Sequence, residues 1–196
     1  MRKFAPVELN AFFAAGDAEL TAPATVKVIG GSALSFYAPE HSTNDIDYVE
    51  NAALFEEACA RLALEKSVVV LPLQRVAVHQ GPEGLDERWE IAPVTPPLKR
   101  LTVLIPERHD LALLKISRGF SHDLEGVYQF HRVQPLELKT LVERAAEGIR
   151  TLDPEPGKVV SARVKSAGWR NCGEPHEQLF CIRDAGLMHG SERAET

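Results

Sequence analysis

Apolar and polar residues alternate with two different periods in the first fifty residues of the chain. A helical spacing predicts a short helix over residues 7–15, and alternation at every second position predicts a strand over residues 24–29. The expected apolar face of the helix comprises Val7, Ala11, Phe12 and Ala15. Residues 32–37 favour a second helix, which Pro39 would end, and residues 46–49 favour a second strand.

The middle of the chain combines one longer helix with several short strands. Residues 51–64 are rich in Ala, Leu and Glu, which is typical of a helix. Its expected buried stripe comprises Ala53, Phe55, Ala58, Cys59 and Leu62. Strands are expected within residues 68–79, with a break near Pro72, within residues 88–92 after a polar turn, and over residues 101–105. This order indicates an α/β (α+β) fold with a mixed β-sheet flanked by helices.

From residue 107 onward the pattern is helical. Apolar residues around Lys115 predict one helix, a second is expected after Gly119, and a third is expected to start at Pro135. The apolar positions of the last two are Leu124, Val127, Tyr128, Leu138, Leu141, Val142, Ala145 and Ile149. We therefore expect a C-terminal helical segment.

Length and pattern together suggest one main domain with additions. A chain of 196 residues and 21.6 kDa is long enough for one well-buried core and a small appendage. We expect an α/β core over residues 1–106, a helical extension packed on it over residues 107–150, and a peripheral, poorly defined tail over residues 151–196.

Composition and charge limit the class of protein. The net charge of −6 argues against broad nonspecific clamping of DNA or RNA, although an RNA end could enter a local basic pocket. No segment approaches the roughly 18 apolar residues of a membrane helix, and the N-terminus does not resemble a secretory signal. The scattered residues Cys59, Cys172 and Cys181 fit a reducing compartment. We expect a cytoplasmic protein without a membrane partner.

Two short motifs carry the chemistry of the first half. Gly30 and Gly31 would let backbone N–H groups approach a phosphate, and Ser32 would open a helix whose positive end faces it. Asp45 and Asp47 are two positions apart, so in a strand they would share a face and repel each other unless a divalent cation lies between them. Each motif also has an ordinary explanation, which is a tight packing turn for the glycines and an exposed loop for the aspartates.

The second half contains a lysine in an apolar helical stretch. Lys115 must either extend its ammonium group to solvent or find an anion, and Arg118 lies three positions later on nearly the same helical face. Asp123 could cap the following helix or pair with Lys115. His109 and His122 are expected at the surface or behind the site, without a metal.

In order and spacing, these residues resemble the DNA polymerase beta-like nucleotidyltransferase superfamily, specifically its minimal, toxin–antitoxin-associated members of the AbiEii and MenT kind. Gly31-Ser32 is followed by twelve residues and then by Asp45-Ile46-Asp47. The segment 107–115, with Lys115 at its end, then Arg118-Gly119 and His122-Asp123-Leu124, also resembles related domains. The resemblance spans residues 24 to about 150.

This resemblance implies an Mg²⁺- or Mn²⁺-dependent enzyme that transfers a nucleoside monophosphate from a nucleoside triphosphate to a hydroxyl group of RNA or protein. It implies Asp45 and Asp47 as catalytic metal ligands and Lys115 as a catalytic, phosphate-binding residue. Gly30, Gly31, Ser32 and Arg118 complete the implied nucleotide-binding set. It also implies a cognate antitoxin as partner.

Several features leave other interpretations open. Superfamily members often add a third carboxylate from a neighbouring strand, and the candidates Glu87 and Glu90 fit that pattern poorly. The alternatives are therefore a nucleotide-binding or protein-interaction module without turnover, and a purely structural α/β domain. The spacing of four further residues matches no strong zinc-ligand pattern. These residues are Cys172, His176, Cys181 and His189.

Overall fold

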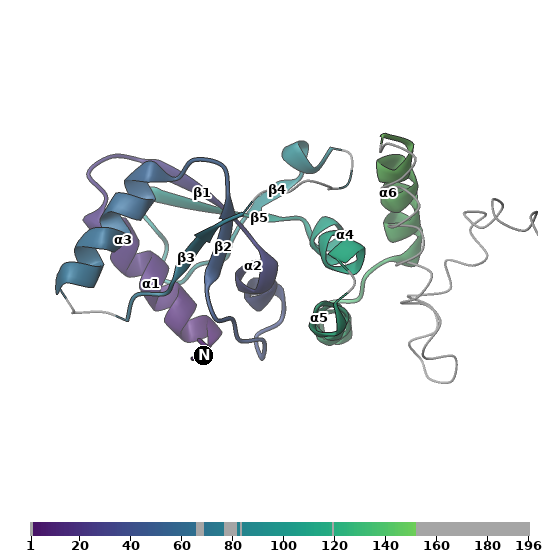
Figure 1. Ribbon diagram of the computed structural model, residues 1–196, viewed down its shortest axis with the longest axis horizontal. Helices are drawn as coiled ribbons and strands as arrows, with labels where there is room; N and C mark the ends of the chain where they lie inside the picture. Colours follow the sequence, from purple (N-terminus) through teal and green to yellow (C-terminus); the bar gives the residue numbers. More distant parts are fainter. Residues whose placement is uncertain (1, 66–68, 77–81, 83, 119, 152–196) are drawn as a thin grey trace, which may run out of the picture. The chain divides into compact units, whose positions relative to one another are not determined.

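A computed structural model describes residues 2–65, 69–76, 82, 84–118 and 120–151 of the chain (Figure 1). The helices are α1 (Pro6–Glu19), α2 (Gly30–Tyr37), α3 (Ala53–Glu65), α4 (Arg108–Arg118), α5 (Ser121–Val133), α6 (Leu138–Thr151) and the 3₁₀ helix η1 (Leu85–Glu87). The strands are β1 (Ala24–Ile29), β2 (Ile46–Val49), β3 (Leu73–Arg75), β4 (Trp89–Ile91) and β5 (Leu101–Pro106). They form two compact units, the first with α1 to α3 and the sheet, the second with α4 to α6.

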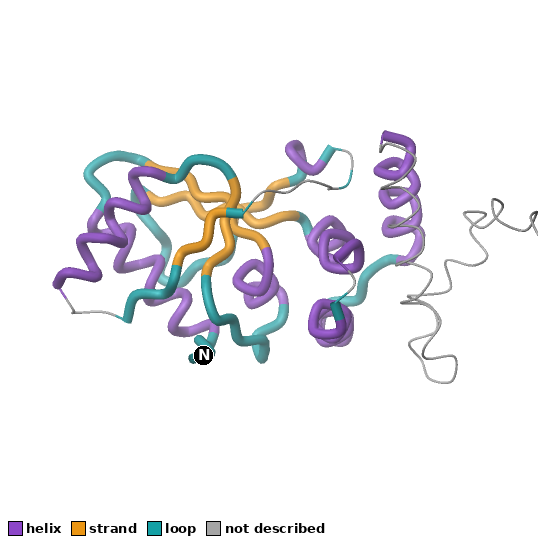
Figure 2. Tube along the Cα trace, viewed as in Figure 1, coloured by secondary structure: helices purple, strands orange, loops and turns teal. Residues whose placement is uncertain are grey.

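The sheet of the first unit is mixed. Its strand order is β3-β2-β1-β5-β4, and Figure 2 shows these strands together in orange. β1 is antiparallel to β2 and parallel to β5, β2 is parallel to β3, and β4 is antiparallel to β5. This confirms the mixed α/β fold that the sequence predicts, including strands at residues 24–29, 46–49 and 101–105.

The two faces of this sheet differ in character, because paired residues of neighbouring strands place their side chains on the same face. One face is almost inaccessible to solvent and is covered by α1, α2 and α3; each of these helices contacts the sheet, and α1 contacts the other two. Its residues include Val26, Val28, Ile46, Tyr48, Val103 and Ile105. The other face, which we call the open face, carries half-exposed or exposed side chains. We define it by Thr25, Lys27, Ile29, Asp47, Gln74, Thr102 and Leu104.

Aromatic rings hold the helical layer together. The Phe13 ring stacks on Phe55 of α3 at 5.9 Å between ring centroids and also contacts Phe36 of α2 at 6.1 Å. Gly16 lies beside this cluster, and a Cβ atom added there would come within 2.8 Å of Phe55 Cε2. The absence of a side chain at Gly16 therefore lets α1 approach α3 closely.

The predicted face of the first helix is wrong except at Phe12, which is buried. Helix α1 is longer than expected and buries Leu9, Phe12, Phe13, Gly16 and Asp17, whereas Val7 is 72% exposed. The aromatic cluster decides the orientation, because two adjacent phenylalanines bury more apolar area than Val7 and Ala11 could. In α3 the expected stripe is buried except at Ala53, which is exposed.

Two further boundaries differ from expectation. Within residues 68–79, only Leu73–Arg75 form a strand in the described part; residues 69–72 do not, and Pro72 cannot donate a ladder hydrogen bond. Residues 66–68 and 77–81 lie outside the described chain. Helix α6 begins at Leu138 rather than at Pro135, because His131 Nδ1 and His109 Nε2 accept the N–H groups of residues 136 and 137. The tail from residue 152 onward, with its cysteines and histidines, also lies outside the described residues.

None of the helices within the described residues has the length and apolar character needed to cross a membrane.

Asp17 joins the end of α1 to the start of β5. Its carboxylate accepts hydrogen bonds from the backbone N–H groups of Lys99, Arg100 and Leu101 at 2.6–3.0 Å. Burial by itself would raise the pKa of Asp17, but these three hydrogen bonds outweigh it and lower the pKa below 3.8. Asp17 thus satisfies three donors at the point where the chain enters the sheet.

We predict that Asp17→Ala lowers the free energy of unfolding at pH 7 by about 2–3 kcal/mol, because the three donors lose their acceptor. Since the folded-state pKa of Asp17 is lowered, its contribution is complete above pH 3.8 and disappears as the pH falls through that lowered pKa. Urea denaturation at several pH values measures the difference between the two proteins. Asp86→Ala, at an exposed position of η1, is the control. A difference that persists unchanged in acid would contradict this account.

Candidate functional site

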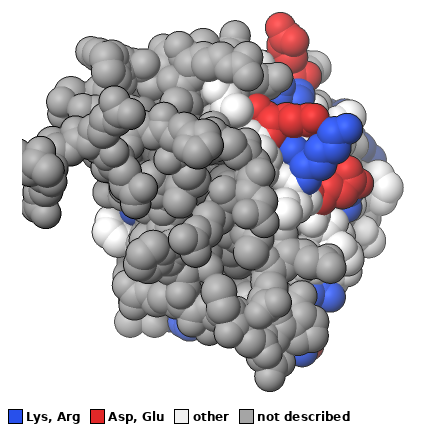
Figure 3. Space-filling model, turned by 90° about the vertical axis from the view of Figure 1, so that its right-hand side faces the viewer, with Lys and Arg blue, Asp and Glu red and all other residues white. Residues whose placement is uncertain are grey.

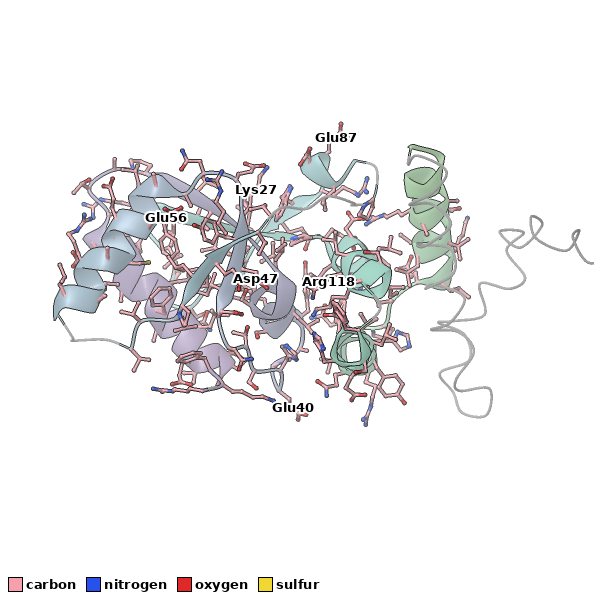
Figure 4. The ribbon with its side chains drawn as sticks, viewed as in Figure 1. Lys27, Glu40, Asp47, Glu56, Glu87 and Arg118 are labelled. Carbon is pink, nitrogen blue, oxygen red and sulfur yellow. The ribbon has the colours of Figure 1, made fainter. Side chains whose placement is uncertain are left out.

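The turn from β1 into α2 places a glycine against an aspartate. Gly30 has a φ of +68°, and Ile29 before it pairs with Asp47 across the β1–β2 ladder. A Cβ atom added to Gly30 would lie 2.2 Å from Asp47 Oδ2, which is far below contact distance. Both the backbone conformation and the neighbouring carboxylate therefore require glycine at this position. Figure 4 labels Asp47 beside α2.

The loop before β2 lies against the second glycine of this turn. A Cβ atom added to Gly31 would lie 3.0 Å from Thr43 Oγ1 and 3.5 Å from His41 Nε2. Thr43 is buried, and its hydroxyl donates a hydrogen bond to the backbone oxygen of Asp45 at 2.9 Å. Phe4 exchanges two backbone hydrogen bonds with Thr43, at 2.7 and 3.1 Å. The loop that leads to Asp45 is thus held from both sides.

The two aspartates are positioned in different ways. Asp47 belongs to β2 and lies on the open face, whereas Asp45 lies in the bend one residue before the strand; both are half-exposed. The alternation of side chains along β2 therefore determines the face of the sheet for Asp47 but not for Asp45. Asp45 depends on Thr43 for its position, which spacing along the sequence does not reveal.

The hydroxyl of Ser32 is used within its own turn. Its side chain is fully buried, and the hydroxyl donates to the backbone oxygen of Ile29 at 2.9 Å. Ser35 similarly donates to the oxygen of Gly31 at 3.0 Å. The Ser32 hydroxyl thus closes the turn from inside. Contacts from this turn to a phosphate would therefore come from backbone N–H groups.

The structure does not bring the two candidate third carboxylates to Asp47. Glu90 pairs with Ile105, so it lies on the helix-covered side of the sheet, where it accepts a hydrogen bond of 3.0 Å from the Tyr37 hydroxyl. Glu87 is exposed in η1, apart from Asp47 (Figure 4). Across the described residues, no group of three or more His, Cys, Asp or Glu side chains is arranged to hold a metal ion.

Two other residues of this unit with reactive side chains, Lys27 and Cys59, lie in surroundings that restrict their reactivity. Lys27, on the open face, forms an ion pair with Glu50, and its ammonium nitrogen lies 5.2 Å from the centroid of the Trp89 ring. Burial, with a smaller contribution from Glu56, raises the pKa of the Cys59 thiol to about 12. A thiol with such a pKa is a poor nucleophile at neutral pH.

The second unit contains a buried cluster of charges. Lys115 of α4 is only 4% exposed, and its ammonium nitrogen lies 3.1 Å from Oδ1 of Asp123 in α5, which has no exposed surface. Arg118 Nη2 approaches the same oxygen at 2.6 Å. This geometry answers the question left open by the sequence, because Asp123 pairs with Lys115 and Arg118, and the N-cap of α5 is Phe120. The cluster of Lys115, Arg118 and Asp123 combines two positive charges with one negative charge.

The two carboxylate oxygens of Asp123 are not equivalent. Oδ1 accepts from both cations, whereas Oδ2 is buried and has no hydrogen-bond partner. His122 is 75% exposed at its side chain and lies with its Nε2 at 3.8 Å from Oδ1, parallel to the Phe120 ring. His109, by contrast, is buried, so a surface position for it is wrong; its Nε2 accepts the backbone N–H of Glu137.

Surface charge in the described part is mixed in sign on the face drawn in Figure 3, where basic and acidic side chains lie next to one another. Helix α6 carries such a pair in Lys139 and Glu143, 3.9 Å apart. Among the described side chains visible in this view, cations lie beside carboxylates and do not form a patch of a single sign.

Comparison with known families identifies a match over residues 16–159, which include both glycines, both aspartates and the charged cluster. The matched family is described as a nucleotidyltransferase of unknown function (DUF6036). The chain belongs to this family. No curated protein and no solved structure is matched by the chain. DUF6036 membership supports a nucleotidyltransferase-like domain, in agreement with the mixed α/β fold.

We predict that Gly30→Ala destabilises the protein by more than the roughly 1–2 kcal/mol that a left-handed backbone costs an alanine, because the Asp47 carboxylate must also move. Thermal and urea unfolding measure the effect. Gly84→Ala is the matched control, since Gly84 has a similar φ of +72°. Equal losses at the two glycines would show that the Asp47 contact contributes nothing.

A second prediction concerns the buried ion pair. Asp123→Ala should lower the free energy of unfolding by about 3–5 kcal/mol, because Lys115 then loses a buried counter-charge. In a double-mutant cycle with Lys115→Met, the free energy of unfolding lost by the double mutant should be smaller than the sum of the two single-mutant losses by at least about 1 kcal/mol. Arg118→Ala, at a half-exposed position, should cost no more than about 1 kcal/mol.

The exposed pair Lys139–Glu143 provides the control cycle, with an expected coupling of about 0.5 kcal/mol or less. A coupling between Lys115 and Asp123 as small as this control value would contradict the assignment of a buried pair.

Proposed function

We propose that this DUF6036 protein is a DNA polymerase beta-like nucleotidyltransferase that depends on Mg²⁺ or Mn²⁺ and transfers a nucleoside monophosphate from a nucleoside triphosphate to a hydroxyl group of RNA or protein. The observation that carries the proposal is the contact between Gly30 and the Asp47 carboxylate. This contact brings the Asp47 carboxylate to the N-terminus of α2, at the turn that leads from β1 into that helix.

The donor set fits a divalent cation of the Mg²⁺ type. Asp45 and Asp47 offer half-exposed carboxylate oxygens, which hard cations prefer. The missing side chain at Gly30 leaves room where a Cβ atom would meet Asp47 Oδ2. These two aspartates would hold the metal, which when bound neutralises charge on the phosphates.

Backbone groups of the same turn would bind the phosphates. The N-cap of α2 has no side-chain hydrogen bond, so backbone N–H groups of its first turn would bind the phosphates. The Ser32 hydroxyl keeps its bond to Ile29, so Ser32 would contribute its N–H group. The helix dipole would favour the negative charge of the phosphate tail.

By the resemblance, Lys115 and Arg118 would bind phosphate, and Asp123 is the positioning residue that restrains both cations. In the proposed reaction, the acceptor oxygen forms a bond to the α-phosphorus while the bond from that phosphorus to the bridging oxygen breaks. Pyrophosphate leaves with that oxygen, and the acceptor proton passes to solvent. The residues contribute by positioning and electrostatics.

A second candidate is a nucleotide-binding or protein-interaction module without turnover. It is favoured by the described residues, which bring no third carboxylate to the aspartates. A role as a cytoplasmic toxin with a cognate antitoxin is a further proposal, and it rests on the resemblance to AbiEii and MenT proteins alone.

Purified protein incubated with each α-labelled nucleoside triphosphate, Mg²⁺ or Mn²⁺, and total RNA or protein tests the proposal. We expect label on RNA or protein, lost on chelation and reduced at least about 100-fold in Asp47→Asn and Asp45→Asn. Lys115→Met should also reduce transfer strongly. Asp86→Asn, at an exposed residue of η1, is the matched control and should retain activity. Nucleotide binding without transfer would favour the module, and activity in Asp47→Asn would overturn the proposed role of this residue.

A further inference from the structure

Three flat side chains meet in the second unit, between the end of α4 and the start of α5. Arg118, labelled in Figure 4, is the last residue of α4, Phe120 is the N-cap of α5, and His122 belongs to the first turn of α5. The Phe120 and His122 rings stack at an interplanar angle of 7°, with 5.6 Å between their centroids. The Arg118 guanidinium and the His122 imidazole approach the same oxygen, Asp123 Oδ1, at 2.6 and 3.8 Å. We call Arg118, Phe120 and His122 the stacking surface.

All three side chains of the stacking surface are accessible to solvent. Phe120 is 57% exposed, the His122 side chain 75% and the Arg118 side chain 47%. One exposed phenylalanine would need no explanation, because apolar atoms make up about half or more of a protein surface. Two parallel rings beside a guanidinium are different, because an incoming aromatic ring can extend the stack while its charged substituent meets the cation. The stacking surface therefore fits a ligand that is flat, aromatic and anionic.

Arg118 gives the stacking surface its positive charge. The hydrogen bond to Asp123 uses Nη2, and a guanidinium carries five N–H donors, so others can face a phosphate. Asp123 has no exposed surface, and the buried ammonium group of Lys115 opposes its charge at 3.1 Å. A phosphate that approaches from solvent therefore meets the Arg118 cation rather than the Asp123 carboxylate.

The expected strength of such a contact favours a strand over a free nucleotide. Stacking of one base on an aromatic side chain changes the affinity by roughly 5- to 150-fold. A dissociation constant of 1 mM already represents about 1,000-fold relative to the 1 M standard state. A free nucleotide would therefore occupy the stacking surface poorly, whereas a strand can combine this contact with others. The bases of a duplex are paired with each other, so only unpaired bases are available for stacking.

We propose that the stacking surface binds an unpaired base of a single nucleic-acid strand, with Arg118 on the adjacent phosphate. The inference goes beyond the proposed function, because this binding requires neither a metal ion nor a nucleoside triphosphate. It is compatible with the net charge of −6, since the contact is local and needs no broad field of cations. Phe120 and His122 supply stacking that tolerates any sequence, because every base has a π face.

The test is the binding of a short, fluorescein-labelled oligouridine RNA to the full chain, measured by anisotropy at several salt concentrations without Mg²⁺ or nucleotide. Phe120→Leu keeps an apolar side chain but removes the π face, so it should weaken binding at least about five-fold at unchanged salt dependence. Phe120→Trp should retain binding. Arg118→Gln should weaken binding and reduce the slope of log affinity against log salt concentration by about 0.7, the value for one phosphate of a single strand.

Two exposed residues at the other end of α5 provide the matched controls, Val133→Ala for the apolar side chain and Arg132→Gln for the cation. We expect Val133→Ala to change the affinity by less than about two-fold, because it has no ring to stack on a base. Arg132→Gln should change the salt slope by less than about half as much as Arg118→Gln. Circular dichroism checks that each variant is folded.

Several outcomes would each overturn the inference. They are no binding of the RNA by the wild-type chain, equal losses in Phe120→Leu and Val133→Ala, and an unchanged salt slope in Arg118→Gln. Binding of uridine monophosphate or of a duplex of the same length as tightly as the single strand would also overturn it. Label transfer is measured separately, so a chain that binds the strand without transfer would contradict the proposed function only.

Discussion

The contact between Gly30 and the Asp47 carboxylate constrains everything around it. It requires β1 and β2 to pair so that Ile29 lies opposite Asp47, and it requires a left-handed residue at the start of α2. The helix then leaves the sheet on the side where Phe36 joins the aromatic cluster of α1 and α3. One close approach therefore connects the packing of the core with the placement of the carboxylate.

The sequence predicts most of the sheet because its strands alternate in a regular way. The mixed α/β fold and the strands β1, β2 and β5 follow directly from that alternation. The whole buried face of α1 could not be predicted in the same way, since Val7 and Phe13 are both apolar and only Phe13 is buried. The distinction depends on Phe55 and Gly16, whose proximity exists only in the folded chain.

The surroundings of the candidate site residues could be predicted only in part, for a related reason. Spacing brings attention to Asp45, Asp47 and Lys115, but it carries no information about tertiary partners. The hydrogen bond from Thr43 to Asp45, the use of the Ser32 hydroxyl inside its own turn, and the position of Glu90 on the covered face all depend on such partners. The pairing of Asp123 with Lys115 was partly predictable, because the sequence left two alternatives open for Asp123, capping of the following helix and pairing with Lys115.

The bridge between Phe4 and Thr43 connects the segment ahead of α1 to the loop that carries Asp45. Thr43 restrains Asp45, and Phe4 restrains Thr43, so the segment ahead of α1 is part of the scaffold of a carboxylate about forty residues away. An affinity tag or deletion that disturbs Phe4 would therefore alter the acidic pair without touching it.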